Sequence, residues 1–196
     1  PRGIVHAFST VPANNQEGPV WLALGDNLFF GSGLGPSLAE QNESPGSSIF
    51  LKEVRNPQDF GVAEIQDGRI ISLQEKPKQP RSSLCITGLY KFDETVWQKF
   101  QNVKPSARGE LEITDLLAGY LGNDGLNYNI LGRGTYWLDT GTAVSMAKAS
   151  AFVESVQSNS GDIVGSPHEA GVRMGLVDVP LFRKISQGLP ESTYGD

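Results

Sequence analysis

The chain has 196 residues, of which 38% are hydrophobic and 19% are charged. This length and composition suit a domain with a buried core of its own, which argues against a disordered chain. The 23 glycines and 12 prolines exclude a helical bundle or a coiled coil. The net charge of −6 argues against duplex nucleic acid as the main partner. Because Cys85 is the single cysteine, an internal disulfide framework and a cysteine-based zinc site are excluded. No apolar run approaches the roughly 20 residues of a membrane span.

Short apolar segments predict strands along most of the chain. The first, residues 20–24, is almost continuously apolar, which is typical of a strand buried on both faces. Asp67-Gly68 separates two further segments and predicts a hairpin between them. The other predicted strands cover residues 48–54, 61–65, 69–73, 85–92 and 128–131.

Helices are predicted over residues 95–100, 109–121 and 142–157, the last with Thr142 as its N-cap. Strands that alternate with helices indicate an α/β fold built on a mainly parallel sheet. The Asp-Gly hairpin makes that sheet mixed. The tail from residue 158 is interrupted by glycine and proline, and the pattern predicts no definite element there.

Two aspartates stand at positions where metal ligands are expected. Asp26 follows the first predicted strand directly, and Asp139 follows Trp137-Leu138. Ligands of open α/β sheets bind beyond the carboxyl ends of strands, and Mg²⁺ is often held by one or two carboxylates together with substrate phosphates. Alternatively, Asp26 is an ordinary turn residue and Asp139 is a helix N-cap. The two aspartates together favour the metal interpretation.

Other local patterns are weaker. Glu75 and Lys76 lie side by side on a proline-stiffened loop and could bind hydroxyls and a phosphate, although a solvated charged loop explains the local sequence better. The glycine-rich residues 31–35 match no established phosphate-binding pattern, so a flexible loop is favoured. His6 and His168 lie far apart and no G-x-S-x-G is present, which argues against a Ser/His/Asp hydrolase.

Four stretches of the chain form an ordered set. They are L-G-D-N-L-F-F-G from residue 24; D-F-G-V-A-E from 59, leading to L-Q-E-K-P-K-Q-P from 73; T-G-L-Y from 87 with R-G-E-L-E-I-T from 108; and L-G-R-G from 131 with W-L-D-T-G-T from 137. In this order and spacing they resemble the glucose-1-phosphate thymidylyltransferases within the sugar-phosphate nucleotidylyltransferases. The resemblance implies a three-layer, nucleotide-diphospho-sugar transferase (Rossmann-like) fold. It also implies Mg²⁺-dependent transfer of a thymidylyl group from dTTP to glucose 1-phosphate, which gives dTDP-glucose and pyrophosphate.

The resemblance assigns roles to residues by position. Asp26 and Asp139 match the Mg²⁺ ligands, Glu75 matches the residue that binds glucose hydroxyls, and Lys76 and Arg108 match the groups that hold the sugar phosphate. The resemblance thus implies that Asp26, Asp139, Lys76 and Arg108 carry the catalysis, by holding the metal and by neutralising charge in an in-line displacement.

Further matches concern the sugar and the base. Gly61 and Ile86 match backbone contacts to the sugar, and Phe60 lies beside them. Pro1 and Gly3 match the end of the segment that frames the thymine base.

Some family features have no counterpart in the chain. The opening pattern G-x-G-T-R-L-x-P, which cradles the triphosphate, is missing, and the chain begins at Pro1 without an initiator methionine or a signal-peptide pattern. An N-terminally truncated fragment with little or no activity of its own is therefore expected. Leu51, Val172 and Met174 also depart from the family pattern.

The expected organisation is a partial nucleotidyltransferase domain over residues 1–157 and an irregular or helical C-terminal region over residues 158–196 that serves oligomerisation or regulation. The resemblance implies a cytoplasmic homotetramer. Two alternatives remain: an inactive remnant or sugar-phosphate-binding module, and a related nucleotidylyltransferase that uses UTP. The T-G-L-Y and W-L-D-T-G-T stretches favour the thymidylyl branch over the second.

Overall fold

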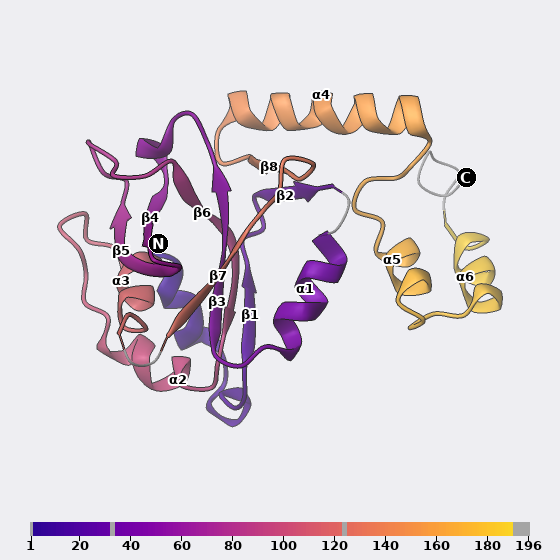
Figure 1. Cartoon of the computed structure of the whole chain (residues 1–196). Helices are drawn as coiled ribbons and strands as arrows, with labels where there is room; N and C mark the ends of the chain where they lie inside the picture. The colour runs from indigo at the N-terminus through magenta and orange to yellow at the C-terminus, as the bar shows by residue number, and fades with distance from the viewer. Residues whose placement is uncertain (1, 32–33, 123–124, 190–196) are drawn as a thin grey trace. The chain divides into compact units, whose positions relative to one another are not determined.

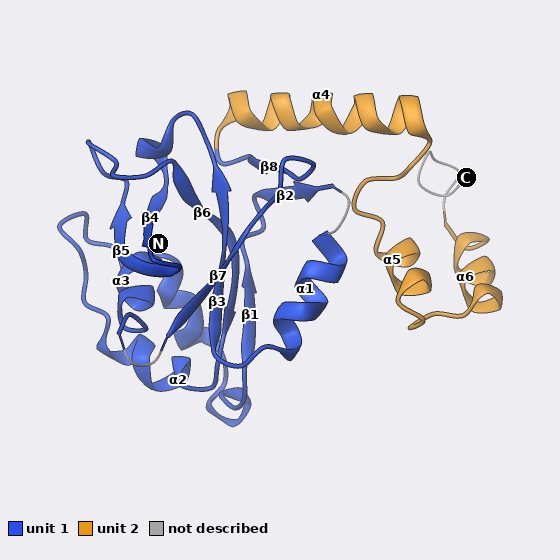
Figure 2. Cartoon of the chain, viewed as in Figure 1, with its two compact units in different colours: residues 1–141 blue, residues 142–196 orange. Residues whose placement is uncertain are grey.

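The computed structural model describes residues 2–31, 34–122 and 125–189 of the chain (Figure 1). The chain divides into two compact units, residues 1–141 and 142–196 (Figure 2). Among the described residues, none of the helices combines the length and the apolar character needed to cross a membrane. Pro1 lies outside the described residues.

The first unit is built on a six-stranded mixed sheet in the order β5-β4-β6-β3-β7, with β1 paired to β6. Its strands are β1 (Val20–Ala23), β3 (Ser47–Glu53), β4 (Gly61–Gln66), β5 (Arg69–Glu75), β6 (Leu84–Phe92) and β7 (Leu126–Ile130). A separate two-stranded sheet consists of β2 (Asn27–Phe30) and β8 (Tyr136–Asp139). The predicted hairpin is confirmed: β4 and β5 pair antiparallel, with Asp67 and Gly68 at φ values of 50° and 73° in the turn.

Helices cover both faces of this sheet. Figure 1 shows α1 (Leu34–Glu43) on one side, with α2 (Val96–Lys99) and α3 (Ile113–Ala118) on the other. The short 3-10 helices are η1 (Ile4–Thr10), η2 (Ala13–Asn15), η3 (Pro57–Asp59) and η4 (Phe100–Asn102). The arrangement is the three-layer, mixed-sheet architecture that the sequence predicts.

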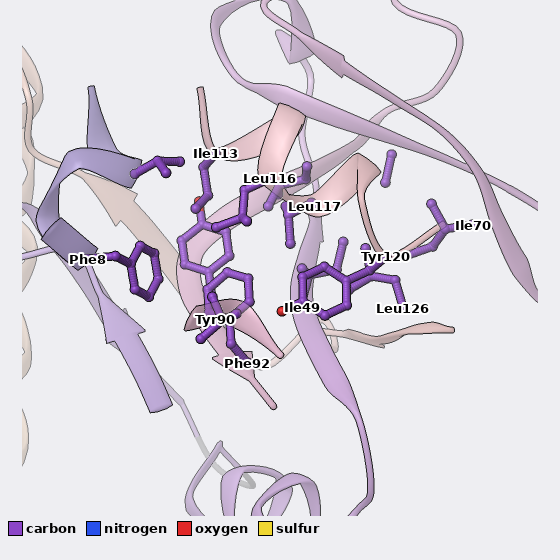
Figure 3. Packing of buried hydrophobic residues seen from close by; sticks show 14 of the residues in the cluster. Phe8, Ile49, Ile70, Tyr90, Phe92, Ile113, Leu116, Leu117, Tyr120 and Leu126 are labelled. Carbon is purple, nitrogen blue, oxygen red and sulfur yellow. The ribbon is translucent and has the colours of Figure 1, made fainter. Parts of the chain in front are cut away.

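Strand alternation explains how the sheet sorts its side chains between the two faces. On β3, Ile49 and Leu51 belong to the larger core cluster, whereas Phe50 between them belongs to a second cluster on the opposite face. Successive residues of a strand point to opposite faces, so β3 is buried on both sides. Figure 3 shows the larger cluster, where Tyr90 and Phe92 of β6 lie near Tyr120 and Leu116.

Three predictions about the elements are wrong. The sheet is not mainly parallel in the described residues: β3 and β7 pair in parallel, but β1, β3 and β4 all run antiparallel to the central strand β6. The tight β4–β5 hairpin adds another antiparallel pair, since a short turn cannot join parallel strands. Strand β1 is only half-buried, because it pairs with β6 alone among the described strands. The helix expected over residues 109–121 forms only over Ile113–Ala118.

At Gly3 the N-terminal segment passes close to the backbone of Leu111, which precedes α3. Leu111 N–H donates to Arg2 O at 2.8 Å, and an added Cβ at Gly3 would lie 2.4 Å from Leu111 O. Gly3 also adopts a φ of 93°, which favours glycine. The close approach therefore requires glycine at this position.

In its described residues, the second unit contains three helices, α4 (Ala143–Ser160), α5 (Pro167–Arg173) and α6 (Val179–Ser186). The predicted N-cap is confirmed: Thr142 and Ser145 form a reciprocal capping box at the start of α4. Ser166 and Asp178 are the N-caps of α5 and α6, and their side chains accept hydrogen bonds from Glu169 N and Leu181 N. The domain boundary that the sequence places after residue 157 stays a prediction.

Candidate active site

A cavity of about 490 Å³ opens on the first unit, beside the carboxyl end of β5 and the middle of β6. Every residue that the sequence analysis proposed for the site lines this cavity, apart from Pro1, which lies outside the described residues. They are Gly3, Asp26, Phe60, Gly61, Glu75, Lys76, Ile86, Arg108 and Asp139. A larger cavity of about 940 Å³ between the start of β5 and β7 contains none of them. The structure thus brings together side chains that are more than 100 residues apart in sequence.

Asp26 and Asp139 lie next to each other because β2 and β8 pair. Asn27 is opposite Asp139 in the register, and both the N–H and the hydroxyl of Thr140 donate to Asp26 O at 2.8 Å. A Cβ built at Gly141 would lie 3.0 Å from Asp139 Oδ1 and 3.6 Å from Asp26 Oδ2, so the two carboxylates flank the same point. The alternative role of Asp139 as a helix cap is wrong, since Thr142 caps α4.

This carboxylate pair fits the donor set of a magnesium site. Among the described residues, no group of three or more His, Cys, Asp or Glu side chains could hold a metal. Mg²⁺ usually keeps several waters and is bound by one or two carboxylates with substrate phosphates rather than by an all-protein cage. Two adjacent aspartates that face an open cavity match that pattern, and the remaining ligands would come from water and phosphate.

Glu75, which the resemblance assigns to the glucose hydroxyls, is the last residue of β5 and lines the cavity. Its Oε2 accepts a hydrogen bond from Thr114 Oγ1 at 3.2 Å. Burial, and secondly the charge of Glu112, raise the pKa of Glu75 above its ordinary value. A carboxylate desolvated in this way gains by accepting hydrogen bonds from hydroxyl groups.

Lys76 follows in a left-handed conformation with φ 42°. Its backbone N–H donates to Phe60 O at 3.0 Å, which joins the end of β5 to the segment before β4. A non-glycine residue in this region carries strain of about 1 kcal/mol or more, and such strain clusters at functional sites. The backbone turn leaves the Lys76 side chain exposed at the rim of the cavity.

Arg108 lies among three carboxylates. Its Nη2 is 3.2 Å from Glu110 Oε2, and its Nη1 is 3.8 Å from both Glu75 Oε1 and Glu112 Oε1. Glu112 is itself buried and accepts a hydrogen bond from Ser106 Oγ at 2.8 Å. A phosphate that binds Arg108 therefore has to compete with carboxylates already around the guanidinium.

Gly61 leaves room in the floor of the cavity. A Cβ there would lie 3.1 Å from Thr114 Cγ2, 3.3 Å from Ile86 Cδ1 and 3.4 Å from Glu75 Oε2. Phe60 beside it packs against Trp137, with ring centroids 4.9 Å apart. The glycine thus allows three elements to converge where the sugar is expected.

Several lining residues were missed by the sequence analysis. They are Asn27, Gly88, Tyr90, Glu112, Thr114 and Trp137. A signal existed for two of them, because Ile86, Gly88 and Tyr90 alternate along β6 and so share one face. Tyr90 is 3% exposed, and burial, then the charges of Glu75 and Asp26, raise its pKa above the ordinary value.

Comparisons with known proteins show the family of the chain. The nucleotidyl transferase family matches residues 1–156. A glucose-1-phosphate thymidylyltransferase of Mycolicibacterium smegmatis is 42% identical over the whole chain, which spans 68% of that protein. One from Actinoplanes sp. is 38% identical over the whole chain, which spans 65% of that protein. The chain thus spans about two thirds of the length of these relatives.

Solved structures show the same fold. A Bacillus anthracis structure described as a glucose-1-phosphate thymidylyltransferase has a TM-score of 0.60 at 40% identity, with 69% of this chain and 55% of that chain covered. A UDP-glucose pyrophosphorylase complexed with UDP-glucose has a TM-score of 0.69 at 21% identity, with 79% and 62% covered. The Rossmann-like nucleotidyltransferase fold expected from the sequence is confirmed. By sequence and by structure, this chain belongs to the nucleotidyl transferase family, as a relative of the glucose-1-phosphate thymidylyltransferases.

Proposed function

We propose that this chain carries the sugar-phosphate-binding and metal-binding part of a site that transfers a thymidylyl group from dTTP to glucose 1-phosphate. The observation that supports it is the single cavity that holds two adjacent aspartates, Asp26 and Asp139, together with Glu75, Lys76 and Arg108. The names of the relatives supply the substrates, and the cavity contains groups suited to the sugar, to its phosphate and to a metal ion.

The proposed reaction is an in-line displacement. An oxygen of the sugar phosphate attacks the α-phosphorus of dTTP, the bond from that phosphorus to the bridging oxygen breaks, and pyrophosphate leaves on the opposite side. Positioning and charge neutralisation carry such reactions, and no covalent enzyme intermediate is needed. Lys76 and Arg108 would hold the sugar phosphate and offset the repulsion between the two anions, while Glu75 would orient the sugar through its hydroxyls.

The charge of the cavity supports a role for a divalent cation. Carboxylates outnumber fixed cations in the lining: Asp26, Asp59, Glu75, Glu110, Glu112 and Asp139 against Lys76 and Arg108. Anionic substrates would be repelled by this balance unless further positive charge is present. Mg²⁺, when held by Asp26 and Asp139, supplies Lewis-acid neutralisation at phosphate oxygens. The homo-oligomeric state and the cytoplasmic location stay predictions.

Calorimetric titration of the chain with glucose 1-phosphate, in Mg²⁺ and in EDTA, tests the binding half of this proposal. We expect saturable binding that weakens strongly in Arg108→Ala and remains in the exposed hairpin variant Asp67→Asn. Absence of binding by the wild-type chain would overturn the site assignment.

A pyrophosphate-release assay with glucose 1-phosphate and either dTTP or UTP tests the reaction. Preference for dTTP supports the thymidylyl assignment, whereas equal or faster release with UTP contradicts it. Because little or no release is expected of the chain alone, the two nucleotides are compared in an active enzyme that contains this segment.

A further inference from the structure

Both the oxygen and the nitrogen of the Asn27 side-chain amide form hydrogen bonds. Its Oδ1 accepts hydrogen bonds from Trp137 Nε1 at 2.6 Å and from Gly88 N at 3.3 Å. Its Nδ2 donates to Asp26 Oδ1 at 2.7 Å. An indole N–H and a backbone N–H can only donate, so the oxygen of the amide must face them and the nitrogen must face Asp26.

Gly88 makes this contact sterically possible. A Cβ at position 88 would lie 2.6 Å from Asn27 Cγ, 2.7 Å from Oδ1 and 2.9 Å from Nδ2. The same residue also accepts a hydrogen bond from Leu24 N at 2.8 Å, just before the turn that leads to Asp26. The middle of β6 therefore serves as a fixed anchor for the Asn27 side chain.

The anchor connects two sheets that carry different parts of the site. Asp26 precedes β2 and Asp139 ends β8, in the two-stranded sheet. Gly61, Glu75 and Ile86 belong to the six-stranded sheet. Asn27 reaches from the first sheet to the backbone of the second, and in the same step orients a carboxylate oxygen of Asp26 and the ring of Trp137.

We propose that Asn27 is a positioning residue that sets the orientation of the Asp26 carboxylate and holds the Asp26–Asp139 pair in register with the sugar side of the cavity. The inference rests on the proposed role of the two aspartates as metal ligands. Hydrogen-bond partners of ligating carboxylates orient these ligands, and their removal typically costs about 10–100-fold in metal affinity.

Nitrogen-15 labelling of tryptophan reads the geometry without any substrate. The chain has three tryptophans, and each indole N–H has a different acceptor: Asn42 Oδ1 for Trp21, Gly18 O for Trp97 and Asn27 Oδ1 for Trp137. We expect Asn27→Ala to move the Trp137 indole signal alone, with Trp137→Phe used to identify that signal. The matched control Asn42→Ala removes the acceptor of Trp21 and should move that signal instead. An unmoved Trp137 signal in Asn27→Ala would overturn the proposed anchor.

Titration with Mn²⁺ as the metal probe tests the consequence for the aspartates. We expect Mn²⁺ affinity to fall about 10–100-fold in Asn27→Ala, to fall several-fold in Trp137→Phe, and to stay unchanged in Asn42→Ala. Wild-type affinity in Asn27→Ala, with loss of binding in Asp26→Asn, would reject the positioning role and leave the metal site intact. Equal affinity in wild type and Asp26→Asn would instead reject the metal site itself. Unchanged Trp21 and Trp97 signals report that Asn27→Ala is folded. If Asn27→Ala does not fold, the Mn²⁺ affinity of Trp137→Phe is the test. Wild-type Mn²⁺ affinity in Trp137→Phe would then contradict the proposal.

Discussion

Replacement of Gly88 by alanine should destabilise the first unit by about 2–4 kcal/mol. The new Cβ would lie 2.6–2.9 Å from three atoms of the Asn27 side chain, well inside van der Waals contact. Overpacking of this kind costs about 1–3 kcal/mol. If Asn27 moves away to relieve the overlap, its hydrogen bonds to Trp137 and Gly88 are lost, at about 1 kcal/mol each.

Urea denaturation followed by tryptophan fluorescence measures this loss, because all three tryptophans lie in the first unit. Gly132→Ala is the matched control: a Cβ at Gly132 meets nothing within 4 Å, so its free energy of unfolding should stay within about 0.5 kcal/mol of wild type. The double variant Gly88→Ala/Asn27→Ala removes the side chain that the new methyl group meets. We expect its destabilisation to be smaller than the sum of the two single changes by at least about 1 kcal/mol.

Two results would refute this reasoning. One is a Gly88→Ala variant as stable as the Gly132→Ala control. The other is a double variant whose loss equals the sum of the single losses, since the methyl group would then not be in conflict with Asn27.

Three other predictions concern the carboxylates and the cap of α4. Asp26→Asn and Asp139→Asn should each lower Mg²⁺-dependent pyrophosphate release by orders of magnitude, measured against Mg²⁺ concentration in an active enzyme that contains this segment, because each removes a charged ligand. Burial raises the pKa of Glu75 above 4.5. The protonated Glu75 side chain therefore contributes stability that is complete below pH 4.5 and is lost as the pH rises through the raised pKa. Glutamine does not titrate, so the free energy of unfolding of Glu75→Gln minus that of wild type should increase from about pH 4 to about pH 7, as measured by urea titration at both pH values. Thr142→Ala should cost about 1 kcal/mol of helix stability and speed amide hydrogen exchange in the first turn of α4, because the capping box with Ser145 is lost.

Each of these has a contrary outcome. Near wild-type turnover in both aspartate variants would remove the metal assignment, with Asp67→Asn as the charge-matched control on an exposed turn. A stability difference between Glu75→Gln and wild type that does not change with pH would contradict the raised pKa. Unchanged exchange in Thr142→Ala, or equal acceleration in the mid-helix control Ser150→Ala, would contradict the role of the cap.

Elements with strong local signals were predictable from the sequence. The Asp67-Gly68 hairpin and the Thr142 cap depend on the backbone preferences of a few neighbouring residues, and both are present in the structure. The central strands β3 and β6 are apolar enough to be identified by composition. The motif residues line one cavity. This was predictable because their types and order resemble those of a family in which the fold brings these residues together.

Elements that depend on distant partners were not predictable. β2 directly follows the turn after β1 and exists as a strand because it pairs with β8, more than 100 residues later. α1 begins with Leu34, Gly35 and Pro36, which reads as a loop, yet proline is tolerated in the first turn of a helix. β1 is half-buried because of the strands that lie beside it, and the apolar sequence of β1 does not predict those neighbours.

The sequence by itself determined the class of the fold, the family and the residue types available for binding a sugar phosphate and a metal, because these follow from local patterns and ordered motifs. The tertiary structure decided how those residues meet: Asp26 beside Asp139, Arg108 among three carboxylates, and Asn27 bonded to the backbone of Gly88. These contacts join segments far apart along the chain. Their geometry is set by strand register and close packing, which no local stretch of sequence encodes.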